Sequence, residues 1–227
     1  MKKVIIGIIT KHFRESVDHF KNTYIVDNTK QAIFDNGGIA IGILPSCFDK
    51  NQASNDWKDS LTLEEKENII EQINLCNGII LQGGGRSEEY ECFIAKYCYE
   101  HDIPCFGICA GKNNMVRAVG GKILRFENIE AHKSSEEYVH DITIHKDSLL
   151  YKIIGKERIK VNSRHKRYTS DPSILQCSSF SDDGVIESVE DKNKKFYLAV
   201  QFHPESLYRT DKNMNNLFKY FINICKN

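Results

Sequence analysis

The stretch Pro104-Cys-Phe-Gly-Ile-Cys-Ala-Gly111 indicates how this chain is built. A short apolar run ends in Gly107-Ile-Cys109-Ala-Gly111, and a helical pattern begins directly after it. The form glycine–x–nucleophile–x–glycine is typical of a strand–turn–helix elbow, which presents its central side chain on a strained turn. A Cβ atom at Gly107 or Gly111 would collide with the neighbouring strand or helix. We therefore predict a buried strand, a tight turn at Cys109 and a helix that starts at once.

Apolar runs and amphipathic stretches alternate on both sides of this elbow. The first half has apolar runs at 4–9, 39–44, 78–81 and 103–108, separated by helical patterns at 17–36, 63–76, 88–101 and 111–119. Continuous apolar strands alternating with helices predict an α/β fold with a parallel sheet covered on both faces. The second half has shorter strands at 142–144, 159–162, 174–177, 185–189 and 196–202, and a last helix at 213–225. No linker separates the halves, so we expect one domain spanning residues 1–227.

The composition excludes several classes of protein. Hydrophobic residues make up 41% of the 227, which is enough for a packed core and excludes a disordered chain. The 31 basic residues are balanced by 31 acidic ones, which argues against a nucleic-acid polymer as partner. No stretch reaches the roughly 18 apolar residues of a membrane span, and the apolar run at 4–9 is too short for a secretion signal. We therefore expect a cytoplasmic protein whose eight cysteines are free thiols.

Cys109 is the candidate nucleophile among these cysteines. It would stand at the carboxyl end of a central strand and beside a helix N-terminus, whose partial positive charge favours a thiolate. A thiol nucleophile also needs a base and a group that orients the base. The segment Gln201-Phe-His203-Pro-Glu205 offers both at the end of the strand predicted at 196–202. We predict that His203 hydrogen-bonds the Cys109 sulfur and that Glu205 fixes the tautomer of His203.

A glycine-rich turn follows the apolar run at 78–81. Backbone amides of Gly84 or Gly85, together with that of Ala110, are candidates for an oxyanion hole that holds a tetrahedral intermediate. The alternative is a phosphate-binding loop. We exclude it because no Gly-Lys-Ser/Thr or Gly-x-Gly-x-x-Gly spacing follows.

These three motifs, in this order, resemble the class I glutamine amidotransferase-like superfamily. Within it, Val161-Asn-Ser-Arg-His165, Asp183-Gly-Val-Ile-Glu187 and Ala199-Val-Gln-Phe-His-Pro-Glu205 look most like the γ-glutamyl-γ-aminobutyrate hydrolase branch. The resemblance implies a flavodoxin-like three-layer α/β/α sandwich, with a mostly parallel central sheet and a smaller antiparallel part in the C-terminal half. It also implies a Cys109–His203–Glu205 triad that attacks a γ-glutamyl amide, forms a glutamyl thioester and releases glutamate. It implies neither a metal ion nor an organic cofactor.

The chain departs from this family pattern at three places around the site. Ala110 and Asn113 stand where the family usually has arginine and glutamine, and the family glutamine helps to hold the glutamyl end. Gly85-Arg86 stands where the family typically has proline or serine and aspartate. An arginine at this position favours an anionic substrate group, whereas an aspartate favours a cationic amine.

A basic segment, Arg164-His-Lys-Arg167, points to the leaving group. It follows Asn162-Ser163, which in the family borders the mouth of the active site, and guanidinium groups match phosphate oxygens. Within the branch, the chain resembles hydrolases of capsule phosphoramidate pathways that cleave γ-glutamyl-CDP-amidate, a nucleotide-linked substrate, and Arg86 adds to this resemblance. A solvated basic loop is an equal alternative. The substrate-binding candidates are Arg86, Asn113, Asn162, Ser163, Arg164, His165, Arg167 and Gln201.

Other functions and features stay open at this point. The chain could be a glutaminase subunit that supplies ammonia to a separate synthetase, a hydrolase of another γ-glutamyl amine, or a non-catalytic regulatory homologue. The sequence does not fix the oligomeric state, and a homodimer is one option. His132, His140 and His145 match no familiar spacing of metal ligands, so we expect them at the surface or rim.

Overall fold

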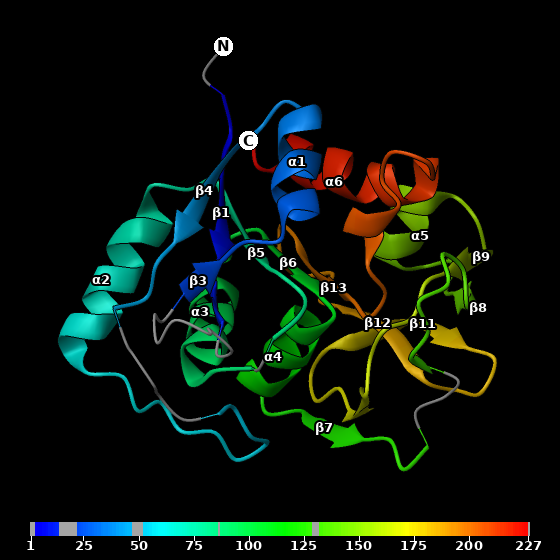
Figure 1. The fold of residues 1–227 in the computed structure, drawn as a ribbon, viewed down its shortest axis with the longest axis horizontal. Helices are drawn as coiled ribbons and strands as arrows, with labels where there is room; N and C mark the ends of the chain where they lie inside the picture. The colour runs from blue at the N-terminus through cyan, green and yellow to red at the C-terminus, as the bar shows by residue number, and fades with distance from the viewer. Residues whose placement is uncertain (1–2, 14–21, 47–51, 86, 129–131, 227) are drawn as a thin grey trace.

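The computed structural model describes residues 3–13, 22–46, 52–85, 87–128 and 132–226. In this part of the chain nine strands form one central sheet in the order β4-β1-β5-β6-β13-β12-β11-β8-β9 (Figure 1). The first five strands run parallel: β4 (Ile39–Ile43), β1 (Ile5–Ile9), β5 (Gly78–Leu81), β6 (Cys105–Ile108) and β13 (Tyr197–Val200). The rest continue the sheet antiparallel: β12 (Ile186–Glu190), β11 (Gln176–Ser181), β8 (His140–Ile144) and β9 (Arg158–Val161).

Helices cover both faces of this sheet, in three layers. One face carries α2 (Leu63–Asn74), α3 (Glu89–Glu100) and α4 (Ala110–Ala118). The other face carries α1 (Asp27–Asp35), α5 (Leu149–Ile154) and α6 (Lys212–Ile224), as Figure 1 shows. Side chains alternate along β1, so that Ile6 and Ile8 pack under the second group of helices and Ile9 under the first. The predicted α/β fold with its antiparallel C-terminal part is confirmed.

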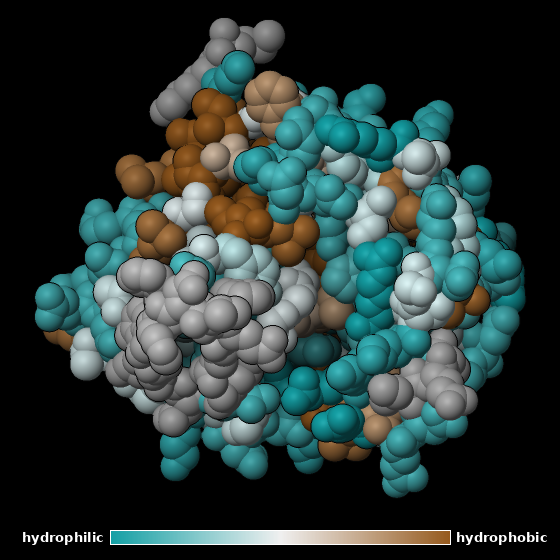
Figure 2. Space-filling view, in the orientation of Figure 1, coloured by the Kyte–Doolittle hydropathy of each residue, from teal (hydrophilic) through white to brown (hydrophobic). Residues whose placement is uncertain are grey.

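Two small sheets flank the central one. They pair β2 (Lys11–Phe13) with β3 (Asn22–Tyr24), and β7 (Lys122–Arg125) with β10 (Arg167–Asp171). Figure 2 shows an apolar area near β1, β4 and α1, where Phe34, Ile39 and Leu44 are exposed. None of the helices in the described ranges has the length and apolar character needed to cross a membrane.

Several predicted elements differ from the observed ones. The helix expected over 17–36 begins only at Asp27, and Asn22–Tyr24 forms a strand instead. A tertiary contact explains this difference: buried Gln82 accepts a hydrogen bond from the Val26 amide and donates to the carbonyls of Tyr24 and Ile9. These bonds hold the chain before α1 extended, and a helical pattern in sequence does not report them. The strand expected at 174–177 is shifted to Gln176–Ser181, and the sequence did not indicate β2, β7, β10 or α5.

The two elbow glycines are required by close packing, as the sequence suggested. A Cβ atom at Gly111 would lie 2.0 Å from the carbonyl oxygen of Leu81 at the end of β5. One at Gly107 would lie 2.4 Å from the sulfur of Met115 in α4 and 2.9 Å from Cβ of Ala199 in β13. The first turn of α4 therefore approaches the neighbouring strand closely enough to exclude any side chain.

We expect Gly111→Ala to lower the free energy of unfolding by about 3 kcal/mol or more, because the methyl group meets a backbone atom that cannot rotate away. Gly37→Ala is a matched control. Gly37 has a φ of +86°, and a Cβ atom there meets nothing within 4 Å. Only backbone strain of about 1 kcal/mol is expected at Gly37. Urea unfolding of both variants measures the difference, and equal losses would contradict the packing argument.

Candidate active site

Cys109 occupies the sharp turn between β6 and α4. Its backbone has φ 50° and ψ −100°, outside the regions that residues with side chains usually adopt. Its amide donates to the carbonyl of Val200 at the end of β13, 2.8 Å away, and the amide of Asn113 bonds its carbonyl. The residue as a whole is 9% exposed, so it lies just beneath the surface. Strained backbone of this kind persists only where its surroundings hold it, and it is common at active sites.

His203 and Glu205 follow β13 and lie beside Cys109. His203 Nδ1 is 2.6 Å from Glu205 Oε1, and Pro204 starts the short 3-10 helix η2 (Pro204–Ser206) between them. Asn162 holds the backbone of His203 by two hydrogen bonds: the His203 amide donates to Asn162 Oδ1 at 2.7 Å, and Asn162 Nδ2 donates to the His203 carbonyl at 2.8 Å. Asn162, which directly follows β9 (Arg158–Val161), therefore fixes the backbone from which the imidazole projects.

The protonation states of Cys109 and His203 depend on one another. Burial alone raises the pKa of the Cys109 thiol, but the charge of His203 and a hydrogen bond to it outweigh burial and leave that pKa below its ordinary value. Burial lowers the pKa of His203, but the charges of Glu205 and Cys109 hold it well above its usual range. Both shifts favour a thiolate on Cys109 and an imidazolium on His203.

The glycine turn after β5 packs directly on this pair. A Cβ atom at Gly83 would lie 2.7 Å from Cε1 of His203 and 3.4 Å from Cβ of Cys109. Gly84 and Gly85 both have positive φ, of +81° and +61°. The sequence did not single out Gly83, although its place at the end of a central strand was a signal. The turn is open only to residues without a side chain, so its backbone can approach a bound group closely.

Two further sequence candidates for the oxyanion and glutamyl sites lie at the start of α4. Ala110 is the first residue of the helix, whose opening amides have no acceptor within the helix. Asn113 is buried, and its Oδ1 has no hydrogen-bond partner among the described residues. An unpartnered buried oxygen is costly unless a ligand supplies the donor.

A buried lysine connects this helix to Gln201. Lys112 donates through Nζ to Gln201 Oε1 at 3.0 Å, to Thr169 Oγ1 and to the carbonyl of Ile186. Burial lowers the pKa of Lys112 to about 8. Gln201 is therefore held by protein on its oxygen side, while its Nε2 has no partner in the described part of the chain. No sequence pattern pointed to Lys112, because a single lysine within a helix is usually exposed.

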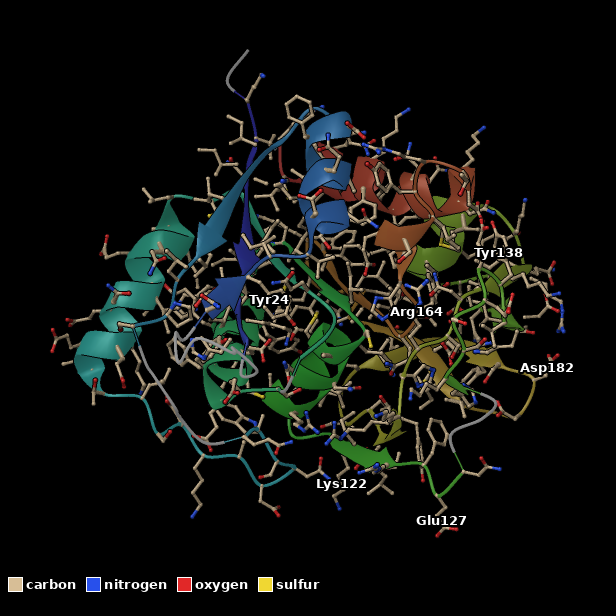
Figure 3. The ribbon with its side chains drawn as sticks, viewed as in Figure 1. Tyr24, Lys122, Glu127, Tyr138, Arg164 and Asp182 are labelled. Atoms are coloured by element: carbon tan, nitrogen blue, oxygen red, sulfur yellow. The ribbon has the colours of Figure 1, made fainter. Side chains whose placement is uncertain are left out.

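The residues of the basic segment predicted at the mouth of the active site differ in their burial. Arg164 is exposed, and its Nη1 donates to Ser206 Oγ at 2.8 Å (Figure 3). Arg167 is half-buried at the start of β10, opposite Arg125. His165 and Ser163 are buried and turn inward, where Ser163 Oγ donates to the carbonyl of His132. Arg86 lies outside the described residues.

Two other features were not expected from the sequence. Lys11 and Glu91 form a buried ion pair, 2.6 Å from Nζ to Oε1, near the glycine turn, where Tyr24 also lies (Figure 3). His132 is buried and His140 half-buried, so the expectation of a surface or rim position is wrong for His132; His145 is exposed as expected. The seven cysteines within the described ranges are free.

Known proteins share this fold, and a family model matches the chain. The structure matches the glutaminase domain of a Trypanosoma brucei CTPS with bound acivicin, with a TM-score of 0.66 and 17% identity over 99% of this chain and 94% of that one. It also matches a glutamine amidotransferase from Thermotoga maritima, with a TM-score of 0.58 and 16% identity over 98% of this chain and 85% of that one. The fold is thus that of class I glutamine amidotransferases. The family model described as Peptidase C26 matches residues 4–205, so the chain belongs to the Peptidase C26 family.

Curated relatives fall into two groups by length. A CTP synthase from Mycoplasmopsis pulmonis is 30% identical over 204 residues, which cover 74% of this chain but 38% of the relative. The protein NtpR from Enterococcus hirae is 25% identical over 236 residues, which cover 96% of this chain and 98% of the relative. The chain therefore spans less than half the length of the CTP synthase and nearly all of NtpR.

We expect His203→Ala to raise the pKa of Cys109 above that of an ordinary thiol, because burial then acts without the charge and the hydrogen bond of His203, and Lys11 opposes it only weakly. The rate at which iodoacetamide alkylates Cys109 at pH 7 should fall by at least about tenfold, since one pKa unit changes the thiolate fraction by that factor. Peptide mass spectrometry at a series of pH values measures this rate. Cys76, whose pKa burial raises to about 11, is the internal control and should react slowly in both proteins. An unchanged Cys109 profile would argue against the ion pair.

Proposed function

We propose that the protein is a cysteine hydrolase that cleaves a γ-glutamyl amide bond and releases L-glutamate. The observation that supports this most directly is the strained Cys109 turn beside the His203–Glu205 pair, 2.6 Å apart, in a chain of the Peptidase C26 family. A thiolate, an imidazolium and an oriented carboxylate are what acyl transfer to a thiol requires. The proposed catalytic residues are Cys109, His203 and Glu205, in one domain.

The reaction follows from these positions. The Cys109 thiolate attacks the γ-carbonyl carbon, forming an S–C bond, while amides of Gly84 or Gly85 and Ala110 donate to the oxyanion. His203 gives its proton to the departing nitrogen as the C–N bond breaks, which leaves a glutamyl thioester. Water then attacks the thioester and gives a proton to His203, and the C–S bond breaks. Glutamate leaves and the thiolate is restored.

We infer that the glutamyl part contacts polar groups that the protein leaves unpartnered. Asn113 Oδ1 and Gln201 Nε2 are buried, one as an acceptor and one as a donor, on elements that border Cys109. The α-ammonium and α-carboxylate of a glutamyl group need one of each kind. Asn113 would then take over the role that the family glutamine usually has.

We propose an anionic, nucleotide-linked leaving group, with γ-glutamyl-CDP-amidate as the best candidate. The backbones of Arg164 and Lys133 pair in an isolated antiparallel β-bridge. Both residues line a cavity of about 500 Å³, together with Ser134 and Ser135. Arg164 also contacts Ser206, which directly follows Glu205. Arg164 and Lys133 thus place two positive charges near the segment that carries His203 and Glu205, where they could bind phosphate oxygens of a substrate. Cleavage of this substrate would release cytidine diphosphoramidate.

A second candidate is a glutaminase that supplies ammonia to a separate synthetase. Its support is the similarity to CTP synthases and to a glutamine-hydrolysing GMP synthase from Brachyspira hyodysenteriae, of which this chain covers 38% and 28% respectively. Hydrolysis of glutamine that starts only when a synthetase is added would favour this candidate over the hydrolase.

The direct test is turnover of γ-glutamyl-CDP-amidate, L-glutamine and an uncharged γ-glutamyl amide by the purified chain. We expect glutamate release from the nucleotide substrate, and we expect Cys109→Ala to reduce it by about 10⁴-fold or more, because no other group can form the thioester. Glutamate release that survives Cys109→Ala would refute the mechanism.

Arg164→Ala tests the leaving group separately. We expect it to raise KM for the nucleotide substrate by about tenfold, the loss of one partly exposed charged contact, and to leave the uncharged amide unaffected. Arg167→Ala is compared alongside, and Lys160→Ala removes an exposed cation from β9 as the control. If neither arginine variant differs from the control, the basic segment is a solvated loop.

A further inference from the structure

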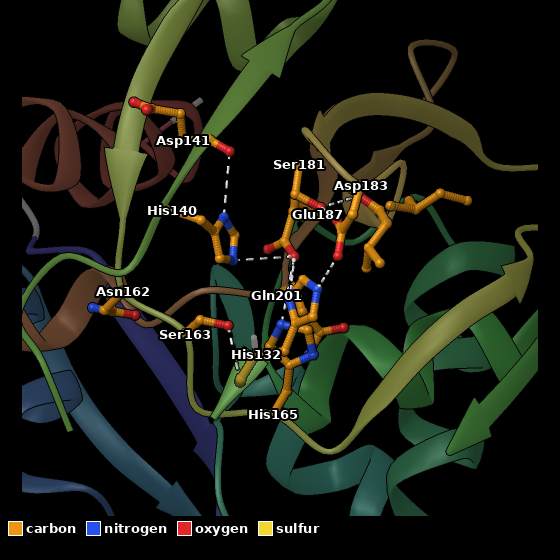
Figure 4. A network of polar contacts seen from close by, with 12 residues as sticks. His132, His140, Asp141, Asn162, Ser163, His165, Ser181, Asp183, Glu187 and Gln201 are labelled. Carbon is orange, nitrogen blue, oxygen red and sulfur yellow. Dashed lines mark hydrogen bonds and ion pairs between the residues drawn. The ribbon is translucent and has the colours of Figure 1, made fainter. Parts of the chain in front are cut away.

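Three histidines and a glutamate meet in a buried cluster behind the proposed active site (Figure 4). They come from four places in the chain: His132 from a loop, His140 from the start of β8, His165 from the loop before β10, and Glu187 from β12. One ligand atom from each lies within 4.8 Å of the others. His132, His165 and Glu187 are buried and His140 is half-buried. Four separate segments have brought metal-binding atoms to one point.

The inward atoms of this cluster lack hydrogen-bond partners. Within the described ranges, this holds for His132 Nδ1, His140 Nε2, His165 Nε2 and both carboxylate oxygens of Glu187. The three ring nitrogens lie 3.7, 3.8 and 3.4 Å from Glu187 Oε1, beyond ordinary hydrogen-bond length. Five unpartnered buried atoms at one place need an explanation, since native proteins leave few.

The outward nitrogens of the same rings are all engaged. His132 Nε2 lies 2.8 Å from Asp183 Oδ2, and His165 Nδ1 lies 2.9 Å from the Arg167 carbonyl. His140 Nδ1 lies 3.3 Å from the Asp141 carbonyl. A carboxylate and a carbonyl only accept, so these nitrogens carry the hydrogens. In each neutral ring, the inward nitrogen then presents a lone pair to the centre of the cluster.

We propose that His132, His140, His165 and Glu187 bind one Zn²⁺ ion. Tetrahedral ligand atoms around zinc lie about 3.3 Å apart, close to the three separations from Glu187 Oε1. Histidines that bind zinc usually donate their other N–H to a carboxylate or carbonyl, as all three do here. This proposal departs from the expectation, drawn from sequence resemblance, that no metal is present. It does not depend on the proposed hydrolase activity.

The site has the character of a structural rather than a catalytic centre. Four protein ligands fill a tetrahedron and leave no open position. The Ser163 side chain and the His165 amide both bond the carbonyl of His132, so the metal would join two loops already in contact. The loop before β10 also includes Asn162, which holds the backbone of His203. Zinc would therefore fix the support of the proposed base without touching substrate.

The competing arrangement has no metal and instead pairs protonated histidine with Glu187. The Lys112 ammonium, which is bonded to Gln201 and to the Ile186 carbonyl, is the other positive charge facing this carboxylate. The two arrangements differ in measurable ways, because only the first holds a stoichiometric metal with a tetrahedral ligand field.

Metal content of the full chain is the first test. We expect about one zinc per chain after dialysis, measured by inductively coupled plasma mass spectrometry. After chelation, we expect Zn²⁺ but not Mg²⁺ to raise Tm by about 10 °C. Co²⁺ added to the apoprotein should give the visible absorption of a tetrahedral site. A wild-type chain that binds neither Zn²⁺ nor Co²⁺ would overturn the proposal.

Variants assign the ligands. We expect His140→Gln and Glu187→Gln to remove the Co²⁺ spectrum, whereas His145→Gln, at an exposed histidine in the same segment, keeps it. Asp183→Asn retains an acceptor on a side chain that is 52% exposed, so folding should be unaffected. Zinc affinity should fall 10- to 100-fold in this variant, about the usual loss for a group that orients a ligand. If His140→Gln and Glu187→Gln both leave zinc binding unchanged, the metal sits elsewhere and the proposal is wrong.

Discussion

The close approach of α4 to the end of β5 is the constraint on which the site depends. Gly111 meets the Leu81 carbonyl with no room for a methyl group, and this contact fixes where the helix must begin. Because only Cys109 lies between the end of β6 and the start of α4, the chain reaches that helix through the strained conformation of Cys109. The same approach brings the glycine turn after β5 against the ring of His203. Packing and strain at one turn thus assemble three sequence-distant motifs.

The antiparallel strands of the sheet support residues that the parallel strands position. The parallel strands supply Cys109, the glycine turn and His203, but His203 leaves β13 in a segment that needs support. That support comes through Asn162, at the end of β9, the last strand of the sheet. The extension of a flavodoxin-like sheet by antiparallel strands therefore has a function beyond covering a core, since it orients the imidazole.

Much of this arrangement follows from local sequence, and some of it does not. The elbow, the parallel strands and the Cys109, His203 and Glu205 positions could be predicted because glycine spacing, apolar runs and a proline-stiffened turn are local signals. The extended chain before α1 depends on Gln82, and the burial of His132 and His165 depends on segments more than 30 residues apart meeting. Local patterns also made Arg164 and His165 look alike, although strand pairing turns one outward and the other inward. Contacts between distant segments carry no periodic signature.

The charges around Cys109 also affect how readily its thiol is oxidised. Peroxides oxidise thiolates much faster than thiols, and burial raises the pKa of Cys92, Cys105 and Cys225. Of these four cysteines, Cys109 would therefore be the first to form a sulfenic acid. A thiol that could trap it as a disulfide must come within about 6 Å between Cα atoms. Cys105, at the start of β6, is the cysteine nearest to Cys109 in sequence. It is wholly buried and burial raises its pKa, so it is a poor thiol for this trapping reaction. The positive charge that lowers the pKa of the Cys109 thiol thus also makes this sulfur more prone to oxidation.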